Sequence, residues 1–175
     1  ADERVTLLTK SSARIAGYFY EIERGIANRI IGNQSALTAL LDTSRSVALV
    51  GARERGGYAT SLLLRKKGNT RTTLPITTLA EKCIWSRNTR AILYCAVPKG
   101  GFDVNQPDAW YQGSAHLSDD IYRIDTESGA AERLLDLSLE AGAELDLTDL
   151  ALDQREEYLI FLDRNTLFLW SLRLE

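Results

Sequence analysis

The ten residues LDTSRSVALV at 41–50 are the strongest indication of the fold, because their pattern occurs twice more in the chain. It reappears as WSRNTRAILY at 85–94 and as LDQREEYLIF at 152–161. Each copy has an apolar strand end, a small or acidic turn residue, a polar turn and then four apolar residues. This repetition predicts three β-hairpins at equivalent places in a repeated unit.

Further strands extend each hairpin into a larger unit. A third strand is predicted at 18–22, 60–64, 120–124 and 166–172, and a fourth at 27–31, 70–76 and 131–137. Gly25, Gly68 and Gly129 lie at the turns between them, where a positive φ costs glycine little. The first two hairpins are 44 residues apart and the last two 67, so the excess of 23 is assigned to an inserted loop at 97–118.

A four-stranded antiparallel unit repeating near 44 residues is typical of a β-propeller blade. We therefore predict an all-β fold, in which residues 1–175 form a single antiparallel β-propeller segment of about three and a half four-stranded blades. The missing half of the ring would come from a longer natural chain or from a second copy. Because inner blade strands are covered on both faces, Leu49, Leu93 and Ile160 are predicted to occupy equivalent buried positions.

These hairpins resemble those of TolB-type and WD-repeat-like propellers, most clearly in CIWSRN at 83–88. The segments KCIWS at 82–86, PDAWYQG at 107–113 and SDDI at 118–121 are similar to uncharacterised bacterial propellers. The resemblance implies no known activity. It implies a location outside the cytoplasm, with an N-terminal membrane anchor upstream of these residues.

Composition and charge exclude several classes. There is no run of about 18 apolar residues that could span a membrane. With one histidine and two cysteines, a Cys/His zinc cluster is excluded. Residues 1–100 carry a net charge of +9 and residues 101–175 a net charge of −12. The basic half lacks interleaved aromatic residues, so a nucleic-acid partner is not predicted.

The inserted loop is the candidate binding site, because it mixes aromatic rings with amides and acids. The candidate ligand contacts are Phe102, Asp108, Trp110, Tyr111, Gln112 and His116. The alternative is that Trp110 and Tyr111 pack back onto the blade and hold the loop. We predict no helix or further strand in the loop, and a Trp110 that contacts ligand should be partly exposed.

Catalysis and metal binding have little support. His116 has Ser114 nearby but no Gly-x-Ser-x-Gly elbow, so no catalytic residue and no cofactor are predicted. Glu144, Asp146, Asp149 and Asp153 lack a calcium-loop pattern and are interpreted as a solvated turn and strand mouth. The acids Asp119, Asp120 and Asp125 are interpreted in the same way.

Cys83 and Cys95 are predicted to lie opposite each other on one hairpin. A disulfide would form in an oxidising compartment, and two buried thiols would fit a reducing one. The thiol form is favoured, because cysteine is often simply buried.

The functional prediction is a non-enzymatic binding or interaction module that takes a protein or glycan ligand at a propeller rim. The alternative is an accessory half of a propeller enzyme whose catalytic residues lie outside this segment.

Overall fold

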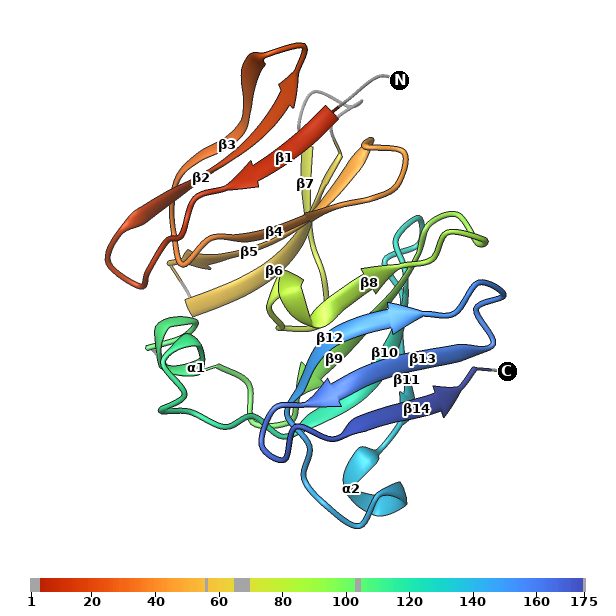
Figure 1. Cartoon of the computed structure of the whole chain (residues 1–175). Helices are drawn as coiled ribbons and strands as arrows, with labels where there is room; N and C mark the ends of the chain where they lie inside the picture. The colour runs from red at the N-terminus through yellow and green to blue at the C-terminus, as the bar shows by residue number, and fades with distance from the viewer. Residues whose placement is uncertain (1–3, 56, 65–69, 103–104, 175) are drawn as a thin grey trace.

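The computed structural model describes residues 4–55, 57–64, 70–102 and 105–174, which form four antiparallel sheets (Figure 1). The first sheet holds β1 (Arg4–Leu8), β2 (Ala16–Glu23) and β3 (Ile26–Ser35). The second holds β4 (Thr38–Leu41), β5 (Val47–Glu54), β6 (Gly57–Leu64) and β7 (Thr70–Thr73). The third holds β8 (Cys83–Trp85), β9 (Ile92–Pro98), β10 (Asp119–Asp125) and β11 (Ala131–Leu135). The fourth holds β12 (Leu147–Leu152), β13 (Tyr158–Asp163) and β14 (Leu169–Arg173).

The predicted all-β division into sheets of three, four, four and three strands is confirmed, and the sheets do not close into a ring. Gly25 and Gly129 have the positive φ values of 76° and 77° that their turns require. The predicted turn at Gly68 lies outside the described residues. Three predicted strands run past the observed ones: β7 ends at Thr73 and not at residue 76, β11 ends before the short helix α2 (Leu137–Glu140), and β14 starts at Leu169, after a turn at 164–166.

Connections between antiparallel strands alternate between the two ends of the strands. One end carries the β1–β2, β9–β10 and β13–β14 connections, and we call it the insertion rim. The opposite end carries the β4–β5, β8–β9 and β12–β13 turns, and we call it the turn rim. Contacts across the sheets support this alignment: the Arg87 guanidinium donates to the carbonyls of Leu152 and Asp153 in the next turn, at 2.9 and 3.0 Å.

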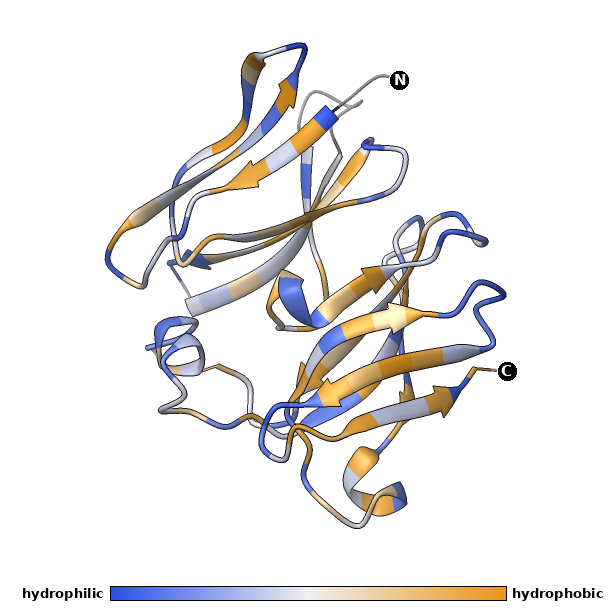
Figure 2. Ribbon diagram, in the orientation of Figure 1, coloured by the Kyte–Doolittle hydropathy of each residue, from blue (hydrophilic) through white to orange (hydrophobic). Residues whose placement is uncertain are grey.

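Buried apolar residues form clusters between successive sheets. The strands that carry these residues are coloured by hydropathy in Figure 2. The inner strands β5 and β9 are buried along most of their length on both faces, so their apolar runs are continuous. Strand β13 alternates between buried and more exposed residues, because no sheet covers its outer face. The first sheet is open too, with Val5 and Leu7 about half exposed, at 54% and 50%.

The positions of Leu49 and Leu93 correct the predicted register. Both are fully buried, as predicted, and both belong to the cluster between the second and third sheets. Ala48 and Val50 belong to the cluster with the first sheet, so Leu49 faces the third sheet and Leu93 faces the second. The two residues pack toward each other and are not equivalent, because a shift of one residue moves a side chain to the other face. Ile160 is only half-buried.

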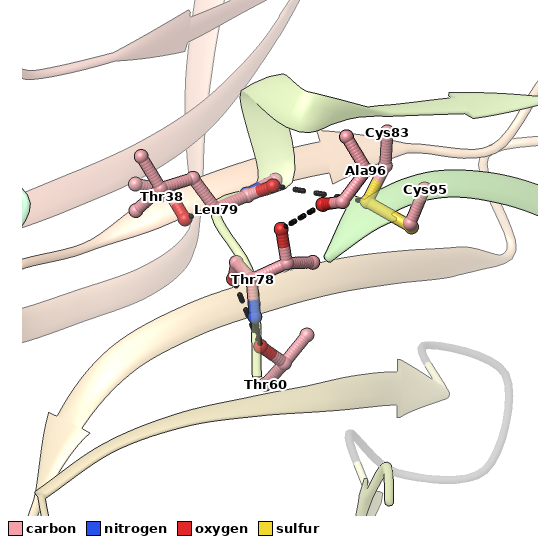
Figure 3. The surroundings of a disulfide bond; sticks show 8 residues. Thr38, Thr60, Thr78, Leu79, Cys83, Cys95 and Ala96 are labelled. Atoms are coloured by element: carbon pink, nitrogen blue, oxygen red, sulfur yellow. Dashed lines mark hydrogen bonds between the residues drawn. A yellow bond between two sulfur atoms is a disulfide. The ribbon is translucent and has the colours of Figure 1, made fainter. Parts of the chain in front are cut away.

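A disulfide joins Cys83 to Cys95, which are direct partners in the β8–β9 register (Figure 3). The preference for two free thiols was therefore wrong, and the alternative pairing holds. Beside it, the Thr78 hydroxyl donates to the Ala96 carbonyl, and the Thr60 hydroxyl donates to the Thr78 carbonyl at 2.9 Å. These bonds fix the segment that leads from the second sheet into the third.

Candidate functional site

The insertion leaves the third sheet after β9 and returns to it at β10. Its base is closed by a bond of 2.8 Å from the Lys99 amide to the Ser118 carbonyl. The insertion contains the one-turn helix α1 (Asp108–Tyr111), so the prediction of a loop without a helix was wrong. This turn is held by local bonds, such as that from the Tyr111 amide to the Pro107 carbonyl, which a period-based reading does not detect.

The insertion contacts all four sheets or their connections. Asp108 accepts a hydrogen bond of 2.9 Å from the Ala13 amide, in the β1–β2 connection. Phe102 packs on Tyr58 of β6, with ring centroids 5.1 Å apart. Trp110 reaches the start of the fourth sheet, where its indole nitrogen donates to Asp146 at 2.9 Å. The insertion therefore spans the rim and links the sheets to one another. We call these contacts of Phe102, Asp108 and Trp110 the clamp.

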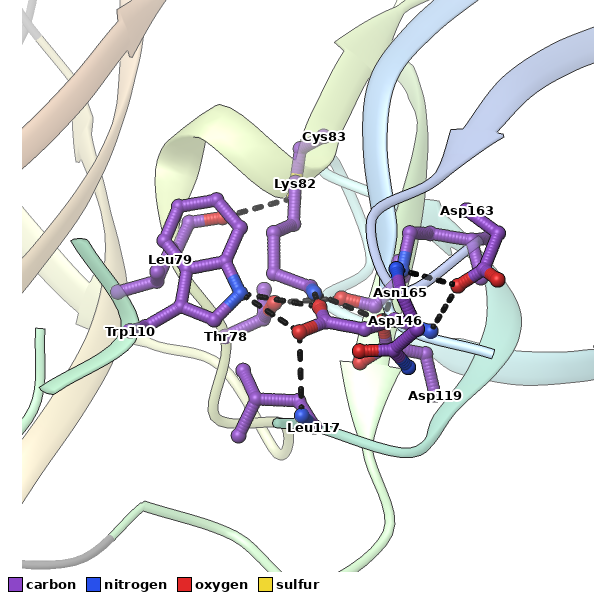
Figure 4. Close-up of polar contacts among 12 residues, drawn as sticks. Thr78, Leu79, Lys82, Cys83, Trp110, Leu117, Asp119, Asp146, Asp163 and Asn165 are labelled. Carbon is purple, nitrogen blue, oxygen red and sulfur yellow. Dashed lines mark hydrogen bonds and ion pairs between the residues drawn. The ribbon is translucent and has the colours of Figure 1, made fainter. Parts of the chain in front are cut away.

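A cluster of buried charges lies beneath α1 (Figure 4). Lys82 is fully buried, and its Nζ lies 2.7 Å from Asp119 Oδ2 and 2.6 Å from Asp146 Oδ1. The Asp146 carboxylate also accepts hydrogen bonds from Trp110 and from the Leu117 amide, at 3.1 Å for the latter. Trp110 and Leu117 of the insertion are thus bonded to one carboxylate, which also pairs with a lysine at the end of the short 3-10 helix Ala80–Lys82, directly before β8.

The two carboxylates that hold Lys82 are not equally satisfied. Asp119 Oδ1 is buried and has no hydrogen-bond partner among the described residues. Burial raises the pKa of Asp119 to about 6, and the attraction of Lys82 opposes this shift without cancelling it. Asp119 therefore changes charge at a milder pH than an exposed aspartate does.

A second polar contact lies on the same side of the insertion. The Tyr111 hydroxyl donates to Glu81 Oε1 at 2.6 Å, and Lys10 Nζ lies 3.4 Å from the centre of the Tyr111 ring. Loss of solvent around its carboxyl raises the pKa of Glu81, although the Tyr111 hydroxyl and Lys10 lower it. Burial and the adjacent Glu81 raise the pKa of Tyr111, so the phenol keeps its proton and acts as a donor.

Between α1 and the β1–β2 connection lies a recess of about 330 Å³. Its polar lining residues come from both segments and are Arg14, Asn105, Asp108, Gln112 and Ser114. Arg14 and Gln112 are exposed at its mouth, while Asp108 is half-buried and bonded to the Ala13 amide. The recess therefore offers hydrogen-bond donors and acceptors on a backbone that the clamp contacts fix.

The structure separates the six predicted ligand contacts into two groups. Trp110 is buried, with 6% of its surface exposed, and so lacks the partial exposure that was predicted for a Trp110 that contacts ligand. Its ring packs near Lys82 and Arg164, and its nitrogen is bonded to Asp146, which is the packing alternative. Phe102, Asp108 and Tyr111 are half-buried in the contacts given above, and Gln112 and His116 are exposed.

The acidic residues also differ from their predicted setting. Asp119, Asp120 and Asp146 are buried in ion pairs, so the interpretation of a solvated strand mouth was wrong for them. Asp125 and Asp153 accept backbone N–H bonds in turns, and Glu144 and Asp149 are exposed. No cluster of His, Cys, Asp or Glu with metal-binding geometry occurs among the described residues.

His116 is exposed, and the Ser114 hydroxyl donates to the Ala109 carbonyl at 3.1 Å. Lys82 is the residue that sequence reasoning missed. Its partners lie 37 and 64 positions further along the chain, and no local pattern distinguishes them from the other acids. The described part of the chain contains no helix long and apolar enough to cross a membrane.

No protein-family model and no curated protein matches the chain. Among solved structures, it is similar to the tricorn protease (TM-score 0.55, 13% identity) and to Kuenenia stuttgartiensis hydrazine synthase (0.56, 12%). It is also similar to TolB from Acinetobacter baumannii (0.55, 13%). The matches cover 97%, 90% and 98% of this chain, but 16%, 49% and 44% of those chains.

At these identities the likeness shows the fold alone. Together with the four antiparallel sheets, it confirms the fold class: this chain is an open segment of a β-propeller, and its four sheets are blades. The chain spans less than half the length of each of these three proteins.

Proposed function

We propose that this segment is a non-enzymatic binding module that takes a protein or glycan ligand at the insertion rim. The observation that carries the proposal is the clamp. A buried contact of Trp110 and a half-buried contact of Asp108 hold the insertion, while Gln112 and Ser114 line a recess beside it. Polar groups on a rigid backbone lose little conformational freedom on binding, which favours recognition.

The experiment compares wild type with a variant whose recess is filled. Gln112→Arg places a larger side chain at the mouth of the recess, and Leu139→Arg, at a residue 79% exposed on α2, is the matched control. Both proteins are tested on a glycan array and on an array of protein domains. The proposal expects a binder that loses about tenfold in affinity with Gln112→Arg and is unchanged by Leu139→Arg. Binders that ignore both substitutions, or no binder, would count against it.

We further propose that the rest of a propeller covers the two outer sheets, as more of the same chain or as a second copy. Support comes from the apolar residues on these sheets, which include Val5, Leu7 and Tyr158, and from the limited coverage of the solved structures. Opposite net charges of the two halves favour contact between unlike ends.

Sedimentation of this chain distinguishes the two sources. A dimer that Leu7→Arg abolishes and Leu139→Arg preserves supports a second copy. A monomer would favour the other source, in which more of the same chain covers the outer sheets. The same substitutions in the full gene product then test that source. A dimer indifferent to Leu7→Arg would contradict closure through the first sheet.

A location outside the cytoplasm belongs to the same proposal. Its support is the Cys83–Cys95 disulfide, because disulfides persist in oxidising compartments. The second candidate function is an accessory part of an enzyme, favoured by the presence of a protease and a hydrazine synthase among the similar structures. An activity of the full gene product that needs residues outside this segment would support that candidate.

A further inference from the structure

A larger groove lies on the turn rim, opposite the insertion. Its volume is about 840 Å³, against about 330 Å³ for the recess at the insertion rim. It opens between the β4–β5 turn of the second blade and the β8–β9 turn of the third, and the β10–β11 turn completes its wall. This volume falls in the range of about 300–1,000 Å³ that is usual for ligand sites.

Local hydrogen bonds fix the walls of this groove. In the second blade, Asp42 accepts from the amide of Val47 at 2.8 Å. In the third blade, Ser86 accepts from the Thr89 amide at 2.7 Å, and the Thr126 hydroxyl donates to the Ala91 carbonyl at 2.9 Å. The last bond joins the two turns of the third blade. The groove is therefore preformed and does not require a ligand to order it.

Several lining groups have hydrogen-bonding capacity that the fold leaves unused. Arg90 and Glu127 are exposed in the third-blade wall, and neither side chain has a partner among the described residues. Trp85 is 93% buried, and its indole nitrogen also lacks an acceptor there. By contrast, Arg87 is bonded to carbonyls of the fourth blade, so its charge is already engaged.

The charges and the exposure of the residues that line the groove favour one class of ligand over the others. The lining sets the carboxylates of Asp42 and Glu127 against two arginines, so it lacks the excess of positive charge that attracts the phosphates of a nucleic acid. The ring of Trp85 is covered, so no aromatic face is open to a sugar. A peptide backbone offers acceptors to Arg90 and donors to Glu127, and a small apolar side chain can pack on half-buried Val47. We propose that this groove binds a short extended peptide segment.

The probe is a phage-displayed library of random short peptides, panned on the folded chain. Enriched peptides are synthesised, and their affinities are measured for wild type and for Arg90→Glu and Glu127→Arg. The groove predicts that each substitution weakens binding about tenfold, the effect of losing one hydrogen bond to a charged group. Arg155→Glu is the matched control, because Arg155 is an exposed arginine of the same rim that does not line the groove.

Enriched peptides that bind both groove variants as tightly as wild type would overturn the proposal, as would a selection that enriches no peptide. Thermal unfolding of each variant verifies that loss of binding does not reflect loss of the fold. Gln112→Arg at the insertion rim should leave peptide affinity within about twofold. The result therefore stays separable from the function proposed for the other rim.

Discussion

The apolar cluster between the second and third blades and the charged cluster beneath the insertion hold the same third blade by different means. The first cluster consists of residues such as Leu49, Leu62 and Leu93, whose packing has no preferred direction. The second depends on Lys82 standing between Asp119 and Asp146, where each charge requires a partner at bonding distance. The comparison teaches that removing one group from the charged cluster damages more than that group's own contacts.

Removal of the Lys82 ammonium should have the largest effect. Lys82→Ala leaves two carboxylates buried without their cation, and breaking a buried pair in this way costs about 3–5 kcal/mol. The free energy of unfolding from urea titration measures the loss. Lys99→Ala is the control, since Lys99 also contacts two aspartates, Asp120 and Asp136, but with a side chain 29% exposed. Similar losses for the two variants would show that burial is not the deciding factor.

The apolar cluster should lose somewhat less when truncated. Leu93 is fully buried between blades, so Leu93→Ala is expected to cost about 2–5 kcal/mol. Ile160→Ala should cost clearly less, because Ile160 is half-buried on the open face of the fourth blade. Urea titration of both variants tests the corrected register. Equal losses would mean that the fourth blade is covered in solution, as closure by a partner predicts.

Removal of the hydrogen bond between Trp110 of the insertion and Asp146 of the charged cluster should lower the free energy of unfolding by a smaller amount. Trp110→Phe keeps an aromatic ring but removes the indole donor to Asp146, which should cost about 1.5–3 kcal/mol. The insertion should also be cleaved faster by protease, because its local opening becomes easier. Tyr111→Phe, which removes only the bond to Glu81, should change both readouts less, because that bond lies nearer to solvent than the bond from Trp110 to Asp146. A Trp110→Phe protein with wild-type stability and cleavage would contradict the clamp.

The two clusters also differ in how far the sequence could predict them. Similarity among three copies of a polar turn followed by four apolar residues located the hairpins around β5, β9 and β13 and placed Cys83 opposite Cys95. The same similarity put Leu49 and Leu93 in register, although an odd shift reverses the face of a strand. The charged cluster was beyond such reasoning, because ion pairs join residues far apart in the chain. For the same reason the sequence left open whether Trp110 contacts ligand or packs onto the blade: nothing local indicates that Asp146 accepts its N–H.

The charged cluster should also make stability depend on pH in an unusual direction. Native Asp119 keeps its proton up to about pH 6, whereas an unfolded aspartate releases it near pH 3.8. Between these values the native state binds more protons, so the contribution of this residue falls as pH rises. Between pH 7 and pH 5, wild type should gain about 1 kcal/mol over Asp119→Asn, which cannot titrate. Urea titrations at both pH values measure this difference, with exposed Glu144→Gln as the control. A constant difference between wild type and Asp119→Asn would show that Lys82 keeps Asp119 ionised, and that attraction outweighs burial in this cluster.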